Sequence, residues 1–226
     1  MSQPFVVVFA IYPGLTQLDF TGPFEVLSRL PGAQVLVASR DGGPIRSDTG
    51  LVFADTGRLA DVPRCGLICV PGGPGVDAAS QDEAFLAQIR RLAAGARYTT
   101  SVCTGSLILG AAGLLKGKRA ACHWAWRDLL PLFGAIPVGD RVVRDGNVIS
   151  GGGVTAGIDF ALVAAAEIAG EQIARAIQLS LEYAPHPPFA SGTPEEAGEA
   201  TVQFIAPRFA GRKQAFAAAH AQDRVS

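Results

Sequence analysis

The stretch that decides the fold runs from Arg97 to Leu107 and reads RYTTSVCTGSL. Its first half is β-prone, and its second half continues into an apolar run with helical character. Small residues stand two positions before and two positions after Cys103, at Ser101 and Gly105. This spacing is typical of a nucleophile elbow, a sharp turn between a strand and a helix that presents a reactive side chain. The stretch therefore predicts a buried strand, a nucleophilic cysteine and a helix, in that order.

A second interpretation of Cys103 remains open on the local sequence. An elbow would place its sulfur at the N-terminus of the following helix, where the helix dipole and free N–H groups favour the thiolate. Unpaired cysteines are also among the most buried residue types, so a structural cysteine is the alternative. The other cysteines, Cys65, Cys69 and Cys122, are expected in the core. The pattern favours the elbow.

Short β-rich runs alternate with helical patterns on both sides of this stretch. Strands are predicted over residues 5–11, 34–39, 67–70 and 98–102. One helix is predicted to begin at Pro23, and another follows a capping box formed by Ser80 and Glu83. Three more are predicted over residues 104–112 and in two segments with an apolar face, around 158–165 and 173–181. This order predicts an α/β fold: a flavodoxin-like, mostly parallel sheet with helices on both faces.

Two further segments complete the expected architecture. Asp145-Gly146 lies between two β-prone runs and predicts a small inserted hairpin. Residues 184–194 are rich in Pro, Gly and Ser and are expected to form a loop before a helical tail. No change in composition marks a domain boundary, so we expect one domain over residues 1–226, with a core from about 5 to 183.

Composition excludes several functional classes. Of 226 residues, 49% are hydrophobic, and 19 Lys and Arg face 20 Asp and Glu, so a basic surface for nucleic acid or a polybasic membrane anchor is not expected. No apolar stretch reaches the ~18–20 residues that span a bilayer. The four cysteines form no CxxC pair and the three histidines are scattered, which argues against a metal site and a disulfide scaffold. We expect a reduced, cytoplasmic protein without a metal.

A glycine-rich loop follows the predicted strand at residues 67–70. It reads PGGPG from Pro71 to Gly75. Ligands of open parallel sheets bind beyond the carboxyl ends of the strands, so this loop should face the same crevice as Cys103. The N–H groups of Gly72 and Gly73 would then be free to stabilise a developing negative charge. An ordinary turn is the alternative.

Asp19 and His123 are the remaining candidate site residues. Asp19 lies between Leu18 and Phe20, so partial desolvation would raise its pKa towards a value useful in acid–base catalysis. Capping of a helix is the alternative role for this aspartate. His123 is one candidate to pair with the cysteine, but a partly buried structural histidine is the favoured interpretation.

The same residues resemble the ThiJ/PfpI superfamily. The resemblance rests on the stretch from Leu18 to Pro23, on Val70-Pro71-Gly72-Gly73 and on Ser101-Val102-Cys103-Thr104-Gly105. Within the superfamily the chain is most similar to the isocyanide hydratase branch, through longer stretches such as 97–124, 135–153 and 157–161.

This resemblance implies hydration of an isocyanide to an N-substituted formamide without metal or organic cofactor. Cys103 would be the nucleophile that forms a covalent thioimidate, Asp19 the general acid and base, and Thr104 a hydrogen-bond donor, with Gly72 and Gly73 near the substrate. The resemblance also implies a homodimer. Asp19 stands where protease- and deglycase-like branches usually have Glu, and Thr104 stands where protease-like members have His. The Thr104 departure argues against proteolysis by a Cys–His–acid site.

Three functional hypotheses follow. The first is the hydratase. The second is a deglycase or glyoxalase-like enzyme that uses the same cysteine. The third is a sensor of oxidants or small molecules in which Cys103 is modified without turnover. The superfamily also has a branch of AraC-type regulators, which carry a C-terminal pair of helix-turn-helix motifs. The Ala-rich tail of this sequence lacks such a pair, so DNA binding is not expected.

Overall fold

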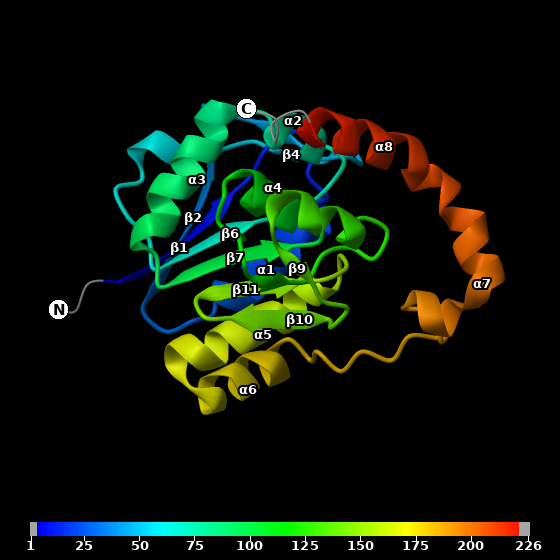
Figure 1. Cartoon of the computed structure of the whole chain (residues 1–226). Coiled ribbons are helices and arrows are strands. Elements are labelled where there is room, and N and C mark those ends of the chain that lie inside the picture. The colour runs from blue at the N-terminus through cyan, green and yellow to red at the C-terminus, as the bar shows by residue number, and fades with distance from the viewer. Residues whose placement is uncertain (1–3, 222–226) are drawn as a thin grey trace.

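The computed structural model describes residues 4–221, which form a central sheet between two helical layers (Figure 1). The main sheet consists of β1 (Phe5–Ala10), β2 (Ala33–Ser39), β5 (Gly57–Arg58), β6 (Leu67–Val70), β7 (Tyr98–Val102), β10 (Val142–Asp145) and β11 (Val148–Gly151). Its strand order is β10-β11-β7-β6-β1-β2-β5. Neighbouring strands pair in parallel except β10 and β11, which form an antiparallel hairpin at one edge. The predicted mostly parallel sheet and the predicted hairpin are confirmed.

Helices cover both faces of this sheet. They are α1 (Gln17–Leu27), α2 (Val76–Ala79), α3 (Glu83–Gly95), α4 (Gly105–Ala111), α5 (Ala156–Ala169), α6 (Glu171–Ser180), α7 (Pro194–Ile205) and α8 (Pro207–Ala221), with short 3₁₀ helices η1 (Leu59–Asp61) and η2 (Arg127–Phe133). The α1, α5 and α6 helices pack together on one face. The α2, α3 and α4 helices lie on the other face with η2 and α8. Two small sheets pair β3 (Ile45–Arg46) with β4 (Val52–Phe53) and β8 (Arg119–Ala120) with β9 (Ile136–Pro137).

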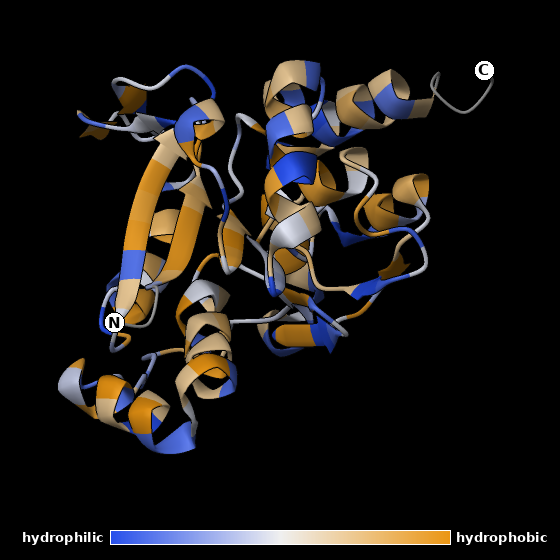
Figure 2. Ribbon diagram, turned by 90° about the vertical axis from the view of Figure 1, so that its left-hand side faces the viewer, coloured by the Kyte–Doolittle hydropathy of each residue, from blue (hydrophilic) through white to orange (hydrophobic). Residues whose placement is uncertain are grey.

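The apolar core follows from the composition of the inner strands. All four residues of β6, LICV, are buried, and so are the last four of β1. Strands covered on both faces need such continuous apolar runs, because neither face meets water. Figure 2 shows this directly, since the strands are coloured as hydrophobic along most of their length.

The helix predicted to begin at Pro23 begins instead at Gln17, so Pro23 lies inside α1. Packing explains why a proline is accepted there. A Cβ atom on Gly157 of α5 would lie 3.0 Å from the Pro23 ring, and one on Gly22 would lie 3.2 Å from Ile158. The two helices therefore approach closely through small residues, and this tertiary contact outweighs the hydrogen bond that proline cannot make. As a consequence, Asp19 lies in the first turn of a helix and not in a loop.

The predicted capping box at Ser80 and Glu83 is also wrong. Asp82 is the N-cap of α3, and its Oδ1 accepts a hydrogen bond from the backbone N–H of Phe85 at 3.1 Å. The Ser80 hydroxyl instead donates to the carbonyl oxygen of Asp77 at 3.2 Å. Asp satisfies the free N–H groups of a helix as well as Ser does, so the nearer residue took the role.

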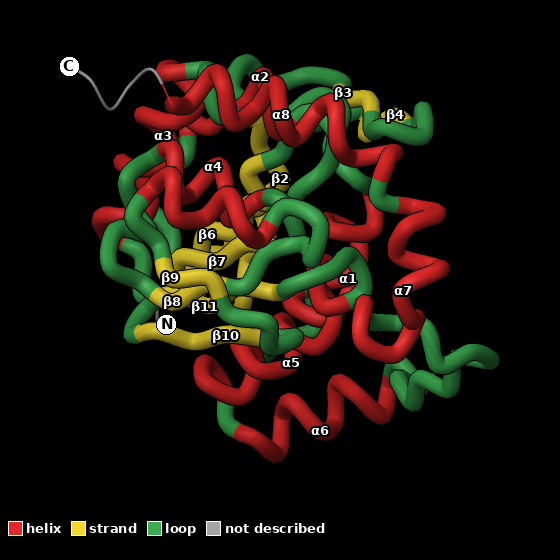
Figure 3. The backbone as a smooth tube through the Cα atoms, turned by 45° about the vertical axis from the view of Figure 1, so that its right-hand side comes forward, coloured by secondary structure: helices red, strands yellow, loops and turns green. Residues whose placement is uncertain are grey.

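The C-terminal segment runs from α6 around the side of the molecule to α8. No residue of α7 is buried, whereas Phe216 and His220 of α8 are. Figure 3 shows α7 outside the sheet layers, between the two helices that it connects. The domain expected from the sequence also includes residues 1–3 and 222–226, which lie outside the described residues. None of the helices within residues 4–221 is long and apolar enough to cross a bilayer.

Candidate active site

Cys103 lies on the turn that joins β7 to α4. Its φ of 57° is in the left-handed region, which a residue with a side chain rarely adopts. The Cys103 N–H donates to the carbonyl oxygen of Gly151 at 3.0 Å, which fixes the turn against β11. Such a conformation costs about 1–3 kcal/mol and persists only where the surrounding structure imposes it. The predicted nucleophile elbow is confirmed.

Gly105 shows why the elbow needs a small residue two positions after the cysteine. A Cβ atom there would lie 2.2 Å from the carbonyl oxygen of Val70 and 2.8 Å from that of Pro71. The first turn of α4 thus packs directly onto the backbone at the end of β6. This contact brings Cys103 and Thr104 beside the glycine-rich loop, as the sequence predicted.

Asp19 reaches the same point from α1. Its side chain is fully buried, and its Oδ2 accepts a hydrogen bond from the N–H of Gly72 at 2.9 Å. Its second oxygen, Oδ1, has no hydrogen-bond partner of ordinary geometry among the described residues. Thr16 is the N-cap of α1, so Asp19 does not cap the helix. Burial raises the pKa of Asp19 to about 7, although the Gly72 N–H and the Cys103 thiol act in the opposite direction.

Gly72 and Gly73 hold the two side chains that flank the cysteine. The Gly73 N–H donates to the hydroxyl oxygen of Thr104 at 2.9 Å, and the Gly72 N–H donates to Asp19. A Cβ atom on Gly72 would lie 2.5 Å from the Thr104 nitrogen and 2.8 Å from Asp19 Oδ2. Both N–H groups therefore have partners within the protein, which differs from the free donors that the sequence led us to expect.

The electrostatics of Cys103 also differ from the expectation. The helix terminus alone favours a thiolate, yet burial and the charge of Asp19 raise the pKa of Cys103 well above its ordinary value. The N–H of Thr104 opposes this effect without cancelling it. Both groups therefore favour their protonated forms, because two neighbouring negative charges are costly in a buried site.

A cavity of about 200 Å³ opens beside the cysteine. Its walls come from the glycine-rich loop, the elbow, the β3–β4 region and the C-terminal helix: Thr16, Asp48, Gly73, Pro74, Cys103, Thr104, His123, Trp126, Val154, Phe209 and Arg212. Asp19 is fully buried and is not part of the cavity wall. A larger cavity of about 380 Å³ lies at the ends of β1 and β2 and contains no cysteine.

His123 lines the cavity but makes no hydrogen bond to Cys103 within the described part of the chain. Its Nδ1 accepts from the Ala125 N–H at 3.3 Å, and burial lowers its pKa, which favours the neutral ring. Among residues 4–221, no group of three or more His, Cys, Asp or Glu side chains is arranged to hold a metal ion.

Sequence reasoning missed the part of the site that comes from distant segments. Phe209 and Arg212 of α8 line the cavity, and so do Trp126 and Asp48. More than 100 residues separate α8 from Cys103 in the chain. The helical character of the tail was visible, but no local signal indicates where an amphipathic helix will pack.

The fold and the site together define a class: an α/β protein whose parallel sheet presents a strained cysteine at the end of an inner strand, beside a buried carboxyl group. Comparison with known proteins specifies this further. The chain belongs to the DJ-1/PfpI family, whose model matches residues 6–167.

Individual relatives agree with this assignment. An isonitrile hydratase of Pseudomonas putida is 57% identical over 194 residues, which cover 86% of this chain and 85% of the relative. The crystal structure of a ThiJ/PfpI family protein from Pseudomonas syringae matches with a TM-score of 0.93 and 40% identity, over 96% of this chain and 90% of the other. Drosophila melanogaster DJ-1beta has a TM-score of 0.70 at 22% identity, over 80% of this chain and all of the other, and shares the fold.

Proposed function

We propose that this protein is an isonitrile (isocyanide) hydratase that adds water to R–N≡C and releases an N-substituted formamide. The observation that carries the proposal is the strained Cys103 with the buried carboxyl group of Asp19 beside it, at a cavity of about 200 Å³. The 57% identity to the isonitrile hydratase of Pseudomonas putida supports the same assignment.

The first step needs a soft nucleophile and a proton at the same carbon atom. As the thiol attacks the terminal carbon of the isocyanide, its proton passes to the carboxylate of Asp19. The protonated Asp19 then delivers this proton to the carbon that has just bonded to sulfur. The product is a thioimidate, R–N=CH–S–Cys103, and Asp19 is again a carboxylate. A pKa near 7 suits a group that both accepts and donates a proton at neutral pH.

The second step consumes water. Asp19 takes a proton from a water molecule as the oxygen bonds to the thioimidate carbon, and it delivers that proton to the nitrogen. The resulting R–NH–CH(OH)–S–Cys103 loses its hydroxyl proton to Asp19 as the C–S bond breaks. The formamide R–NH–CHO leaves, and the cysteine sulfur recovers its proton from Asp19. The reaction as a whole adds one water and needs no redox agent.

The remaining residues assist charge transfer. The Thr104 N–H faces the Cys103 sulfur and stabilises the thiolate when the C–S bond breaks. The Gly72 N–H stabilises the carboxylate of Asp19 each time it carries the negative charge. The Gly73 N–H fixes the Thr104 side chain. In this proposal the two glycines therefore act on charge through Asp19 and Thr104, and not by binding the substrate directly.

Turnover of phenyl isocyanide by the wild type and by Cys103→Ala tests the proposal. Absorbance follows loss of the isocyanide, and chromatography identifies N-phenylformamide. We expect formamide at a catalytic rate from the wild type and from Cys122→Ala, the matched control at another buried cysteine, and none from Cys103→Ala. Turnover that survives in Cys103→Ala would rule out the proposed nucleophile.

The same experiment separates the two other hypotheses. Methylglyoxal in place of the isocyanide tests the hypothesis of a deglycase or glyoxalase-like enzyme. That hypothesis requires turnover of methylglyoxal and no turnover of the isocyanide. Peroxide treatment followed by mass spectrometry tests the hypothesis of a sensor. That hypothesis requires oxidation of Cys103 with no turnover of methylglyoxal or of the isocyanide.

A further inference from the structure

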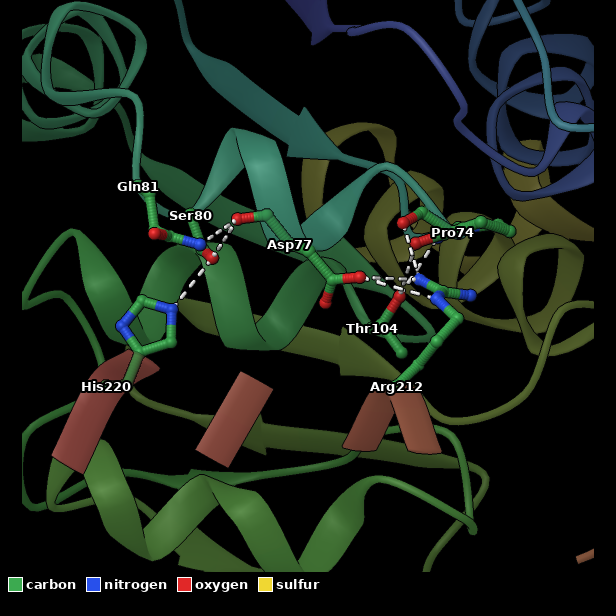
Figure 4. A network of polar contacts seen from close by, with 8 residues as sticks. Pro74, Asp77, Ser80, Gln81, Thr104, Arg212 and His220 are labelled. Atoms are coloured by element: carbon green, nitrogen blue, oxygen red, sulfur yellow. Dashed lines mark hydrogen bonds and ion pairs between the residues drawn. The ribbon is translucent and has the colours of Figure 1, made fainter. Parts of the chain in front are cut away.

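The C-terminal helix α8 forms part of the cavity wall, although the proposed chemistry uses none of its residues. Phe209 and Arg212 both line the space beside Cys103 and Thr104. Figure 4 shows Arg212 reaching from α8 towards Pro74, Asp77 and Thr104. The helix therefore contributes to the wall of the same cavity that Cys103 lines.

Arg212 connects α8 to the glycine-rich loop. Its guanidinium donates to the carbonyl oxygen of Pro74 and pairs with Asp77 Oδ2 at 3.0 Å. The same group lies 5.5 Å from the ring centre of Trp126, within range of a cation–π contact. Pro74 directly follows the two glycines that hold Asp19 and Thr104, so one side chain links α8 to the catalytic loop.

The far end of α8 is held by a second set of contacts. The Ser80 hydroxyl and His220 Nε2 are 2.9 Å apart, and Phe216 packs against Trp126 with ring centres 5.9 Å apart. Lys213 pairs with Asp128 of η2 at 2.7 Å. These contacts hold the C-terminal half of the helix, and the Arg212 contacts hold the part that lies beside the cavity.

Phe209 is the apolar residue of α8 that lines the cavity. Its ring centre lies 5.4 Å from that of His123 and 5.8 Å from that of Trp124. His123 and Trp126 also line the cavity, so Phe209 belongs to an aromatic part of its wall. The volume of about 200 Å³ that they enclose admits a compact substituent.

We propose that, in the hydratase reaction proposed above, Phe209 determines the size of the isocyanide substituent, and Arg212 is the positioning residue that holds Phe209 against the cavity. The preferred substrate is an isocyanide with a compact, uncharged alkyl or single-ring aryl substituent. A two-ring substituent meets the Phe209 ring and is discriminated against.

Removal of the Phe209 side chain tests the size limit. For Phe209→Ala we expect the ratio of kcat/KM for 2-naphthyl isocyanide to that for phenyl isocyanide to rise about tenfold or more, the usual range for a changed apolar contact in a binding pocket. Phe204→Ala is the matched control, because Phe204 is 76% exposed on α7 and is not part of the cavity wall. An unchanged ratio in Phe209→Ala would overturn the assignment.

A second readout does not depend on isocyanide turnover. Cys103 is alkylated with iodoacetamide and with N-(2-naphthyl)iodoacetamide, and the rates are read by mass spectrometry. We expect Phe209→Ala to raise the rate of the bulky reagent relative to the small one about tenfold, and Phe204→Ala to leave it unchanged. If the wild type hydrates no isocyanide but this ratio shifts, the proposed function is wrong and the size limit set by Phe209 is supported. If the ratio does not shift, the role of Phe209 is wrong.

Arg212 is tested for positioning by combining variants. Arg212→Gln should shift the turnover ratio and the alkylation ratio in the same direction as Phe209→Ala. In the double variant each ratio should exceed that of Phe209→Ala by no more than about twofold, because both changes act on the same part of the cavity wall. Arg208→Gln, on the same helix but placed over Phe204, should shift neither ratio. Equal losses for both reagents, or effects that multiply, would contradict positioning. Arg212→Lys gives the same comparison with the charge kept, should Arg212→Gln fail to fold.

Discussion

Asp19 occupies a position that is costly for the folded state and useful for chemistry. Its carboxyl group is fully buried, has one strong hydrogen bond from Gly72 and leaves Oδ1 without a partner of ordinary geometry among residues 4–221. Stability alone would favour an apolar or amide side chain there. The cost is understandable if Asp19 exchanges a proton with Cys103, since both pKa values are raised by the same burial.

Asp19→Asn should abolish most of the activity while leaving the fold intact. The amide oxygen can still accept from the Gly72 N–H, but the amide cannot carry a proton between sulfur and carbon. A positioned acid–base group contributes about 10²–10⁴-fold in rate, and we expect a loss in this range in phenyl isocyanide turnover. Mass spectrometry should detect a stalled adduct on Cys103 if addition still occurs. Asp55→Asn, at an exposed aspartate, is the control, and near wild-type turnover by Asp19→Asn would remove the proton-transfer role.

The same substitution should also make stability less dependent on pH. The pKa of Asp19 is about 7 when folded and 3.8 when unperturbed, so between these values the folded state holds a proton that the unfolded state has lost. Stability of the wild type therefore falls as pH rises through this window, by a few kcal/mol at most. Asn does not titrate. Relative to the wild type, Asp19→Asn should gain free energy of unfolding from pH 5 to pH 8.

Urea unfolding of both proteins at pH 5, 6, 7 and 8 measures this difference. The Cys103 thiol stays protonated across the range because its pKa is also raised, so it adds no slope of its own. A difference between the two proteins that does not change with pH would mean that Asp19 titrates near its ordinary value.

At the scale of elements, the close packing of α4 onto the end of β6 determines where the cysteine points. Gly105→Ala should disturb this contact, because the added Cβ meets the backbone carbonyl oxygens of Val70 and Pro71. Overpacking of this kind costs about 1–3 kcal/mol. We expect lower stability in urea and a loss of turnover, since the elbow must shift. Gly95→Ala, where a Cβ meets nothing within 4 Å, should be close to neutral. Wild-type behaviour of Gly105→Ala would show that the elbow tolerates displacement.

The elements also show which features could be predicted from sequence. Strands buried on both faces were predictable because their apolar runs are continuous, and the elbow was predictable because its small residues lie within five positions. The start of α1 could not be predicted, because contact with α5 outweighs the local preference of Pro23 for the first position of a helix. The raised pKa of Cys103 was missed for a similar reason, since it depends on burial in the folded protein and then on Asp19, which lies 84 positions earlier in the chain.

At the scale of the whole molecule, we expect a homodimer in solution. The resemblance to known enzymes led to this expectation, and exposed apolar side chains support it. Leu179 of α6 is 80% exposed and Phe189 is 78% exposed. Large apolar side chains at such exposure favour association. Light scattering should give a mass close to twice 23.4 kDa across the micromolar range. A mass of one chain at all concentrations would contradict the dimer.

The position of α8 at the end of the chain has a consequence for the order in which the protein is made. Residues 5–183 contain every strand of the main sheet together with Cys103 and Asp19, so the ribosome makes them before the tail. The segment that completes the cavity wall, up to Ala221, then takes about 2–8 s at ordinary rates of translation. Until α8 packs, the cavity beside Cys103 lacks Phe209 and Arg212, so we expect the thiol to be more accessible to oxidants during synthesis than in the complete fold.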